Sequence, residues 1–323
     1  MAVHIFVLNE ENYKKCILNG VAAIPDGNKA NTMDALISRM ALIREGDHVL
    51  FYITGKKELR GVFKAQSRPF YDTQKVWPQE EQLYPLRIRI DNSKYVFPTP
   101  IRLSDIYDLR DTGKIWTFTL KRFMTTNVMF SISDQEFGEL LNLYLKLNPI
   151  YSKPKPIQQP YPYREPDLKN YLACNGNEPK FFEYTLMSLL SNDLAEGKFK
   201  HIFGDYSDYL SYVPTSFERE IDMLLIFNHP EHPQQIIAYN ILELKKDKFD
   251  TSGLKQLLQY EDWFLRKKAH GDSSMLRTTA IAQKFDSEVI DYLKKRKEYE
   301  NKSVTLLKYE YVSNELILNE VPF

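Results

Sequence analysis

Cysteine is scarce in this chain. Its 323 residues include two cysteines, Cys16 and Cys174, and no CxxC or Cys/His spacing. A disulfide framework and a zinc site are therefore excluded as organising features. An apolar run of 18 residues is also absent, and the first 15 residues are too polar for a secretory signal. We expect a soluble intracellular protein of the cytoplasm.

An excess of charge is lacking as well. Lys+Arg and Asp+Glu both number 43, and residues 168–323 hold 20 basic against 24 acidic residues. A strong non-specific DNA-binding protein would be basic, so this class is disfavoured. A metal-dependent nuclease stays compatible, because such an enzyme gathers carboxylates at its site.

A proline-rich segment divides the sequence. Residues 149–166 contain six prolines and no apolar periodicity, which is typical of an extended tether. A chain of this length also exceeds one ordinary core. We predict a first domain over residues 1–147, a linker over 148–167 and a second domain over 168–323.

The first half reads as short strands with a few helices, which predicts an α+β domain with a small mixed barrel or sheet. Residues 31–43 have helical spacing, and a Gly-Asp turn at Gly46 and Asp47 leads into an apolar strand. Ser133 and Glu136 form a capping-box pattern that predicts a helix start.

The second half begins with a helical pattern and then alternates between strands and helices in the order α-β-β-α-β-α-β. Apolar runs over residues 220–227 and 236–242 predict two strands, and residues 253–269 predict a helix. This order is typical of a mixed sheet flanked by helices, an α/β architecture.

Three charged residues lie at the ends of these two strands. Asp222 is early in the first strand, Glu243 ends the second, and Lys245 follows on the same face. Carboxylate oxygens suit Mg²⁺ or Mn²⁺, and an ammonium group stabilises charge on a phosphate. Such a site predicts a phosphodiester hydrolase, although an isolated Glu-x-Lys at a strand end is more often a solvated edge.

Further candidates lie in the flanking helices. Glu183 is placed to add a third metal-binding carboxylate, with Glu178 as the alternative, and either residue can equally be a surface acid. Gln256 and Tyr260 share a helix face four residues apart and could position metal, water or phosphate.

The ordered set of Glu, Asp, Glu-x-Lys and Gln-x-x-x-Tyr resembles the PD-(D/E)XK nuclease superfamily, especially its NucS-like branch. The resemblance spans residues 178–285 and implies a restriction-endonuclease-like fold and a metal-dependent endodeoxyribonuclease. Ile221 stands where many members have proline. The implied catalytic residues are Glu183, Asp222, Glu243, Lys245, Gln256 and Tyr260, and the implied metal ligands are Asp222, Glu243 and Glu183.

Strand and turn patterns in the first half resemble the EVE branch of PUA-like domains, relatives of the YTH readers. They include a Gly-Asp turn before Tyr52, "Phe-Tyr-Asp" after the Gly61 strand, and "Tyr-Pro-x-Arg-Ile". The resemblance implies a PUA-like β-barrel that holds a flipped, modified base between aromatic walls. The candidate pocket residues are Trp77, Tyr52, Tyr71, Trp116, Ser38 and Asp72. The candidate phosphate-binding residues are Arg39, Lys64, Arg68, Arg87 and Lys121.

The combination of a domain that binds a modified base and a nuclease domain, joined by a tether, predicts a modification-dependent DNA endonuclease of the restriction or defence type. A double-strand cut would require two active sites, so we expect a homodimer or pairing on DNA. Two alternatives stay open at this point: a structure-specific or mismatch repair endonuclease, and a non-catalytic module that binds modified nucleic acid. RNA as the substrate is also open.

Overall fold

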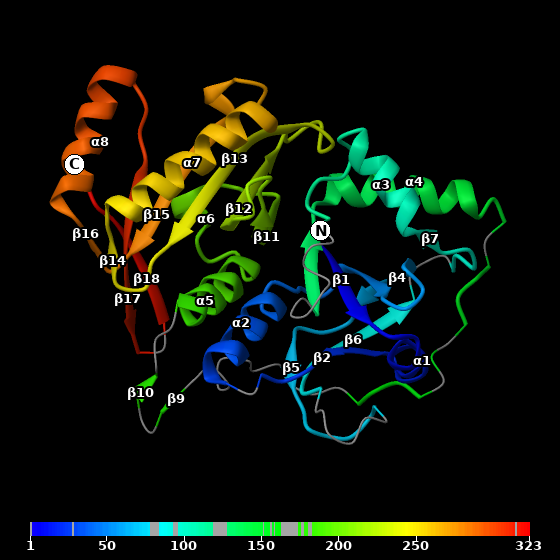
Figure 1. Ribbon diagram of the computed structural model, residues 1–323. Helices are drawn as coiled ribbons and strands as arrows, with labels where there is room; N and C mark the ends of the chain where they lie inside the picture. Colours follow the sequence, from blue (N-terminus) through cyan, green and yellow to red (C-terminus); the bar gives the residue numbers. More distant parts are fainter. Residues whose placement is uncertain are drawn as a thin grey trace. The chain divides into compact units, whose positions relative to one another are not determined.

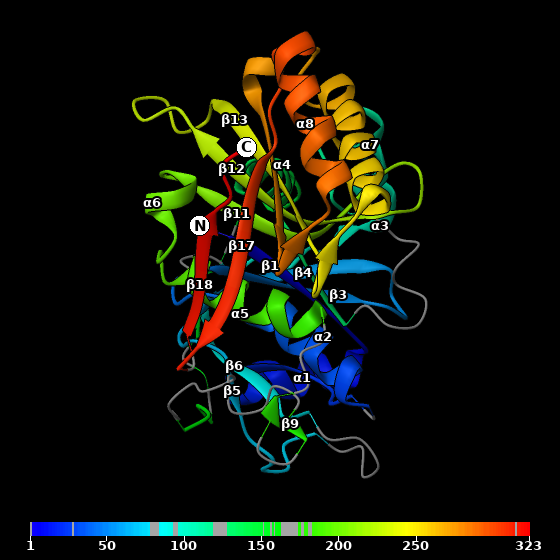
Figure 2. The same ribbon diagram turned by 90° about the vertical axis from the view of Figure 1, so that its left-hand side faces the viewer.

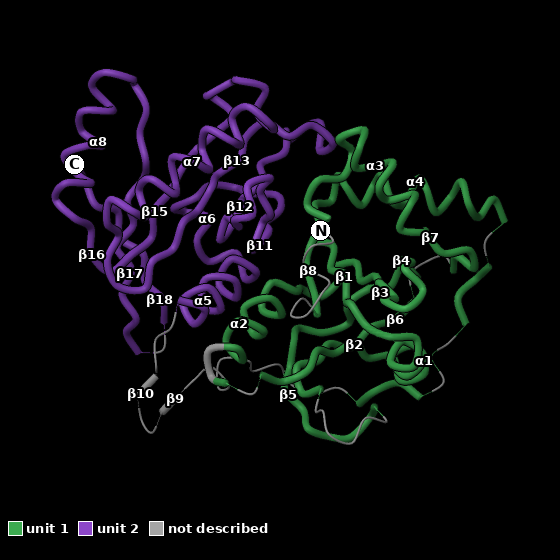
Figure 3. The backbone as a smooth tube through the Cα atoms, viewed as in Figure 1, with its two compact units in different colours: residues 1–180 green, residues 181–323 purple. Residues whose placement is uncertain are grey.

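Two units make up the chain. The computed structural model describes residues 2–27, 29–77, 84–92, 96–118, 128–150, 152–155, 157, 159–162, 174–175, 178–179, 183–313 and 315–323. Contacts divide it into residues 1–180 and residues 181–323 (Figure 3). No described helix has the length and apolar character needed to cross a membrane.

The first unit contains a curled, half-barrel sheet with helices around it (Figure 1). Its strand order is β2-β6-β4-β3-β1-β8, with β5 paired to β6 and β7 paired to β4. The strands are β1 (Val3–Leu8), β2 (Val21–Ile24), β3 (His48–Ile53), β4 (Glu58–Ala65), β5 (Phe70–Tyr71), β6 (Leu86–Asn92), β7 (Ile101–Arg102) and β8 (Met129–Ile132). β1 runs parallel to β3 and antiparallel to β8.

The described helices of the first unit are α1 (Glu10–Asn19), α2 (Ala30–Met40), α3 (Leu103–Asp111) and α4 (Asp134–Leu147). Two of them, α1 and α4, begin after a residue whose side chain caps a free backbone N–H group. Asn9 caps α1, and Ser133 and Glu136 form the capping box expected for α4. The same Glu136 carboxylate is buried and also accepts the backbone N–H groups of Trp116 and Thr117. One carboxylate therefore fixes both the start of α4 and the segment before β8.

The expected Gly-Asp turn is present before β3, and Asp47 ties it to β1. Gly46 has φ of +90°, a value that favours glycine. The buried Asp47 carboxylate accepts the Ala2 N–H at 3.0 Å and the Arg44 N–H at 2.8 Å, and lies 3.1 Å from the ring of His4. Burial opposes ionisation, but these donors hold the pKa of Asp47 below its ordinary value.

Part of the proline-rich segment lies against the first unit. Ser152 forms a backbone bridge with Val96, and Tyr161 donates its N–H to the Asn19 carbonyl at 2.8 Å. The Tyr161 side chain is buried. These described residues of the predicted linker are therefore bound to the unit that precedes them through backbone hydrogen bonds and the buried Tyr161 side chain.

The second unit has a six-stranded mixed sheet in the order β11-β12-β13-β15-β17-β18. Its strands are β11 (Asp208–Pro214), β12 (Glu220–Asn228), β13 (Ile236–Leu244), β15 (Leu276–Ala282), β17 (Thr305–Val312) and β18 (Glu315–Glu320). β13, β15 and β17 are parallel, and the outer strands are antiparallel. The order and type of these elements confirm the expected mixed sheet.

Helices cover both faces of this sheet. They are α5 (Glu183–Ala195), α6 (Lys200–Phe203), α7 (Thr251–Lys267) and α8 (Ser287–Glu300). Figure 2 shows α7 and α8 on one side and α6 on the other. Short elements complete the chain: β9 (Cys174–Asn175), β10 (Glu178–Pro179), β14 (Lys248–Phe249), the 3₁₀ turn η3 (Ser273–Met275) and β16 (Lys284–Phe285). The two-domain fold class expected from the sequence is confirmed.

Candidate functional site

The register of two antiparallel strands brings the two central carboxylates together. Met223 of β12 pairs with Leu242 of β13. Continuing this register by one residue sets Asp222 opposite Glu243. Residues opposite each other in an antiparallel pair point to the same face, with Cβ atoms about 5 Å apart. The sheet therefore places Asp222 and Glu243 beside each other on one face.

Hydrogen bonds fix these two side chains. Asp222 Oδ2 accepts the backbone N–H of Leu244 at 2.8 Å. Glu243 is completely buried, and its Oε1 accepts Lys245 Nζ at 2.8 Å. Among the residues that the structure describes, none donates to Glu243 Oε2. A buried carboxylate oxygen without a donor is costly, and a cation at this oxygen would remove the cost.

The electrostatics of the site favour protonated acids in the metal-free protein. Burial raises the pKa of Glu243 to about 7, against the opposing charge of Lys245. Burial and the neighbouring Glu243 raise the pKa of Asp222 well above its ordinary value. Burial disfavours the charged lysine, but the two acids outweigh it and raise the pKa of Lys245. A divalent cation would replace the protons of these two acids and stabilise the ionised carboxylates.

Glu183 lies at the edge of this cluster. It begins α5, its side chain is 43% exposed, and its Oε1 is 3.9 Å from Lys245 Nζ. Within the described residues, no group of three or more His, Cys, Asp or Glu side chains is close enough to hold a metal ion. The structure therefore brings Glu183 to the lysine and offers Asp222 and Glu243 as the central oxygen donors. The alternative acid, Glu178, is in β10, a strand whose side chains lie outside the description.

Gln256 and Tyr260 form a link between α7 and β12. Gln256 Nε2 donates to the Tyr260 hydroxyl at 2.9 Å, and this hydroxyl donates to the Glu220 carbonyl at 2.7 Å. Tyr260 is fully buried, and burial raises its pKa to about 12. Because Glu220 is two residues before Asp222, this link holds the strand that carries the acid.

Arg219 is a cation that the sequence analysis missed. It is exposed in the turn before β12, and its charge partly offsets the burial that raises the pKa values of Glu243 and Tyr260. The only available signal was its position three residues before Asp222, which any surface arginine could share.

Two of the expected base-pocket residues are core residues of the first unit. Tyr52 is 4% exposed within the main hydrophobic cluster and meets Phe118 edge-on at 6.2 Å. Ser38 is fully buried and donates its hydroxyl to the Ala35 carbonyl at 2.8 Å. Their placement favours packing and helix structure, because neither side chain faces an opening.

Two other pocket candidates, Asp72 and Trp77, lie in a buried polar cluster with the phosphate-binding candidate Arg87 and with Tyr161, which the sequence analysis did not single out. We call these four residues the Tyr161 cluster. Trp77 lies in the loop after β5 and is 4% exposed. The Arg87 guanidinium lies 5.2 Å from the Trp77 ring and 5.2 Å from the Tyr161 ring. Tyr161 donates to Asp72 and accepts from Arg87. Its ring stacks on Phe70 at 6.0 Å.

The remaining candidates for base and phosphate binding are scattered. Tyr71, Trp116, Arg39 and Lys64 are half-buried, and Arg68 donates to the Ile43 carbonyl. Arg87 is 2% exposed, so its expected contact with solvent-side phosphates is not available in this structure. Lys121 is outside the described residues.

No family model and no curated protein matches the sequence. Among solved structures, similarity is found to a hypothetical protein from Leishmania major at 18% identity and a TM-score of 0.34. It covers 45% of this chain and 96% of that one. Similarity to human THYN1 in complex with DNA containing 5-methylcytosine has 15% identity and a TM-score of 0.32, covering 45% and 98%.

The second unit's likeness is weaker. A repair endonuclease from Pyrococcus abyssi is 17% identical with a TM-score of 0.26, covering 38% of this chain and 46% of that one. Neither likeness is strong enough to support a functional argument. The function is therefore inferred from the geometry of the site.

Proposed function

We propose that this protein is a metal-dependent DNA endonuclease whose second unit hydrolyses phosphodiester bonds. The observation that carries the proposal is the fully buried Glu243, whose Oε2 has no donor among the described residues while Asp222 lies beside it. Two such acids are suitable ligands for Mg²⁺ or Mn²⁺, ions that usually keep several waters. When bound, the ion supplies Lewis-acid activation of water and neutralises phosphate charge.

Each residue of the site has a distinct role in this proposal. Asp222 and Glu243 hold the ion, and the Leu244 N–H orients Asp222. Lys245, at 2.8 Å from Glu243, brings a positive charge toward the scissile phosphate. Glu183 contacts this lysine from α5 and is the proposed third oxygen donor on DNA binding. Arg219 adds a cation for the DNA backbone at the entrance of the same strand.

The first unit is proposed to bind a modified base through the Tyr161 cluster. A planar base that displaced Tyr161 would take the place of its ring, beside the Arg87 guanidinium and the Phe70 ring. Asp72 would accept from the edge of the base and Arg87 would donate to it, as they do with the Tyr161 hydroxyl. Stacking and hydrogen bonds of this kind offset the few kcal/mol that base flipping costs.

This arrangement would make the enzyme modification-dependent, with Tyr161 as an internal occupant that a suitable base replaces. A double-strand cut would then require two copies of the chain on one DNA. The anion-binding and stacking groups do not distinguish DNA from RNA, so the substrate test includes both.

Cleavage assays test the proposal. Duplex DNA with and without 5-methylcytosine, a mismatched duplex and a matched RNA are incubated with Mg²⁺ or Mn²⁺ and with the Glu243→Gln variant. We expect metal-dependent cutting of the modified duplex that the variant lacks. Preference for the mismatched duplex would indicate a repair enzyme. Binding without cutting under every condition would reduce the protein to a nucleic-acid-binding module.

A further inference from the structure

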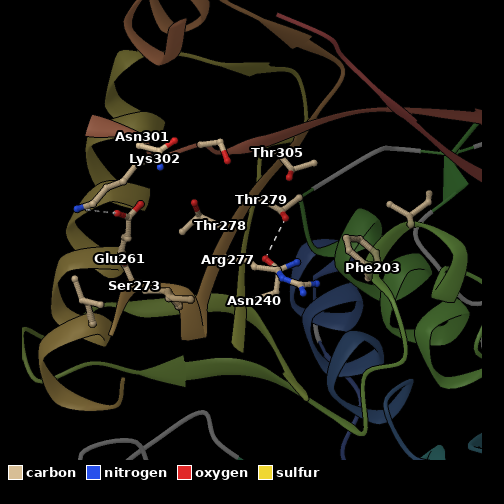
Figure 4. Close-up of a pocket in the computed structure, with 14 residues that line it drawn as sticks. Phe203, Asn240, Glu261, Ser273, Arg277, Thr278, Thr279, Asn301, Lys302 and Thr305 are labelled. Carbon is tan, nitrogen blue, oxygen red and sulfur yellow. Dashed lines mark hydrogen bonds and ion pairs between the residues drawn. The ribbon is translucent and has the colours of Figure 1, made fainter. Parts of the chain in front are cut away.

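A cavity of about 410 Å³ lies in the second unit, away from the two carboxylates. Figure 4 shows its walls: α7 with Glu261 on one side, Phe203 of α6 on the other, and the start of β15 between them. Asn240 of β13 contributes to it, three residues before Glu243. Asp222, Glu243 and Lys245 are not among its lining residues, and three residues span about 10 Å along a strand. The cavity is therefore separate from the proposed catalytic site.

The cavity exists because two neighbouring strands begin at different levels. β15 pairs with β13 from Leu276 onward, but it pairs with β17 only from Thr279 onward. The first three residues of β15 consequently lack a β17 neighbour. The segment from Asn301 to Ser303, between α8 and β17, borders this opening instead.

Buried polar side chains line the opening. Asn240 and Thr278 are 4% exposed, and Thr279 is 2% exposed. Thr279 donates its hydroxyl to Asn240 Oδ1 at 3.0 Å, so the amide of Asn240 is held in place (Figure 4). The hydroxyls of Ser303 and Thr305 lie at the more exposed rim. A wall of neutral hydrogen-bonding groups suits a polar ligand and disfavours an apolar one.

The charges at the cavity favour an anion. Glu261 is its acidic lining residue, and the buried Arg296 already binds both oxygens of that carboxylate, at 3.0 and 2.5 Å. Lys302 is 4.0 Å from the same carboxylate and stays 39% exposed. Arg277 is exposed, contacts the Phe227 ring, and has no described acid as an ion-pair partner. Two cations therefore face the cavity with one neutralised acid between them.

We propose that this cavity binds the phosphate group of a nucleotide. Arg277 and Lys302 would hold the phosphate oxygens, and the hydroxyls of Thr278 and Thr305 would donate to it or to the sugar. Its volume is within the about 300–1,000 Å³ range of small-molecule sites. The phosphate could come from a free nucleotide or from the 5′-phosphorylated end of a DNA strand, which is the kind of end that a nuclease leaves.

Calorimetry of the full chain in EDTA tests this inference. The probes are inorganic phosphate, deoxycytidine monophosphate, and one short oligonucleotide with either a 5′-phosphate or a 5′-hydroxyl. We expect saturable binding of a phosphorylated probe that the Arg277→Gln/Lys302→Gln double variant weakens about tenfold or more, an effect of about 1.4 kcal/mol. The matched control is Lys294→Gln/Lys297→Gln, which removes two exposed cations of α8 and should leave binding unchanged.

The probes separate the two sources of phosphate. Binding of the mononucleotide indicates a free nucleotide, and binding of the 5′-phosphorylated strand without the mononucleotide indicates a DNA end. The proposal would be overturned if both double variants weakened the binding of the phosphorylated probe equally. It would also be overturned if the 5′-phosphate and 5′-hydroxyl strands bound equally and the mononucleotide did not bind. Glu243→Gln should leave this binding intact, so the result is independent of the proposed nuclease chemistry.

Discussion

Neutralising Glu243 should make the metal-free protein more stable at alkaline pH. Burial raises the pKa of this carboxyl from its ordinary 4.5 to about 7. A group whose pKa is raised on folding contributes stability below its unfolded pKa, and this contribution is lost as pH rises through its folded pKa. At about 1.4 kcal/mol per pH unit, ionising Glu243 at pH 8.5 costs the folded state about 3 kcal/mol. Glu243→Gln removes this cost and keeps an oxygen for Lys245.

Hydrogen exchange of the intact chain measures this effect in the second unit alone. The reporter amides are those of β12 and β13, including Leu244, which donates to Asp222. Comparing wild type and variant at the same pH cancels the intrinsic pH dependence of exchange. The variant should be protected about 100-fold more at pH 8.5, and the difference should shrink toward pH 4.5.

Magnesium should close most of this difference in protection between wild type and Glu243→Gln. An ion that binds only the folded protein stabilises it by about 2.7 kcal/mol at 100 times its dissociation constant. Wild type should gain this protection at pH 8.5 and Glu243→Gln should not. The control is Glu298→Gln, an exposed acid of α8, for which no change is expected. Equal protection of wild type and Glu243→Gln at pH 8.5 without metal would refute the reasoning.

Three further predictions follow from individual contacts. Lys245→Met should lower cleavage by about 100-fold or more, and a cleavage rate that survives it would remove the lysine from the mechanism. Tyr161→Ala should strengthen binding of DNA that carries the recognised base, measured by fluorescence anisotropy; weaker binding together with a lower melting temperature would mark Tyr161 as purely structural. Asp47→Asn should cost the first unit about 1–3 kcal/mol at pH 7. That cost should fade below pH 4, because a carboxyl whose pKa is lowered by folding no longer stabilises the fold once it is protonated. Hydrogen exchange of the β1 amides measures this loss of stability.

The catalytic candidates were accessible from the sequence because strand periodicity determines them. Asp222 lies at the end of the polar stretch that leads into one predicted strand, and Glu243 lies at the end of the apolar run of the next. Because side chains alternate between the two faces of a strand, Lys245 is on the same face as Glu243. Local chemistry also predicted the capping box at Ser133 and the turn at Asp47. In both the capping box and the turn, the residues that form the sequence pattern are within a few residues of the backbone that they stabilise.

Residues that act across long sequence separations were not predictable in this way. Trp77 has polar neighbours in the sequence, but Arg87, which lies over its ring, comes from β6. Arg87 also lies over the ring of Tyr161, which comes from the proline-rich segment. The proline content of that segment predicted a tether, because proline stiffens the backbone. Composition does not tell which residues a tyrosine within the segment contacts. The cavity beside β15 depends on the level at which β17 joins the sheet, which no local pattern encodes.

Binding of Mn²⁺ followed by electron paramagnetic resonance is the most direct test of the central claim, that Asp222 and Glu243 together hold a divalent cation. The account predicts saturable binding to the wild-type chain that Mg²⁺ displaces and that weakens on acidification below pH 7. It also predicts loss of this binding in both Asp222→Asn and Glu243→Gln, with Glu298→Gln unaffected. Undiminished Mn²⁺ binding in the two variants would contradict the account.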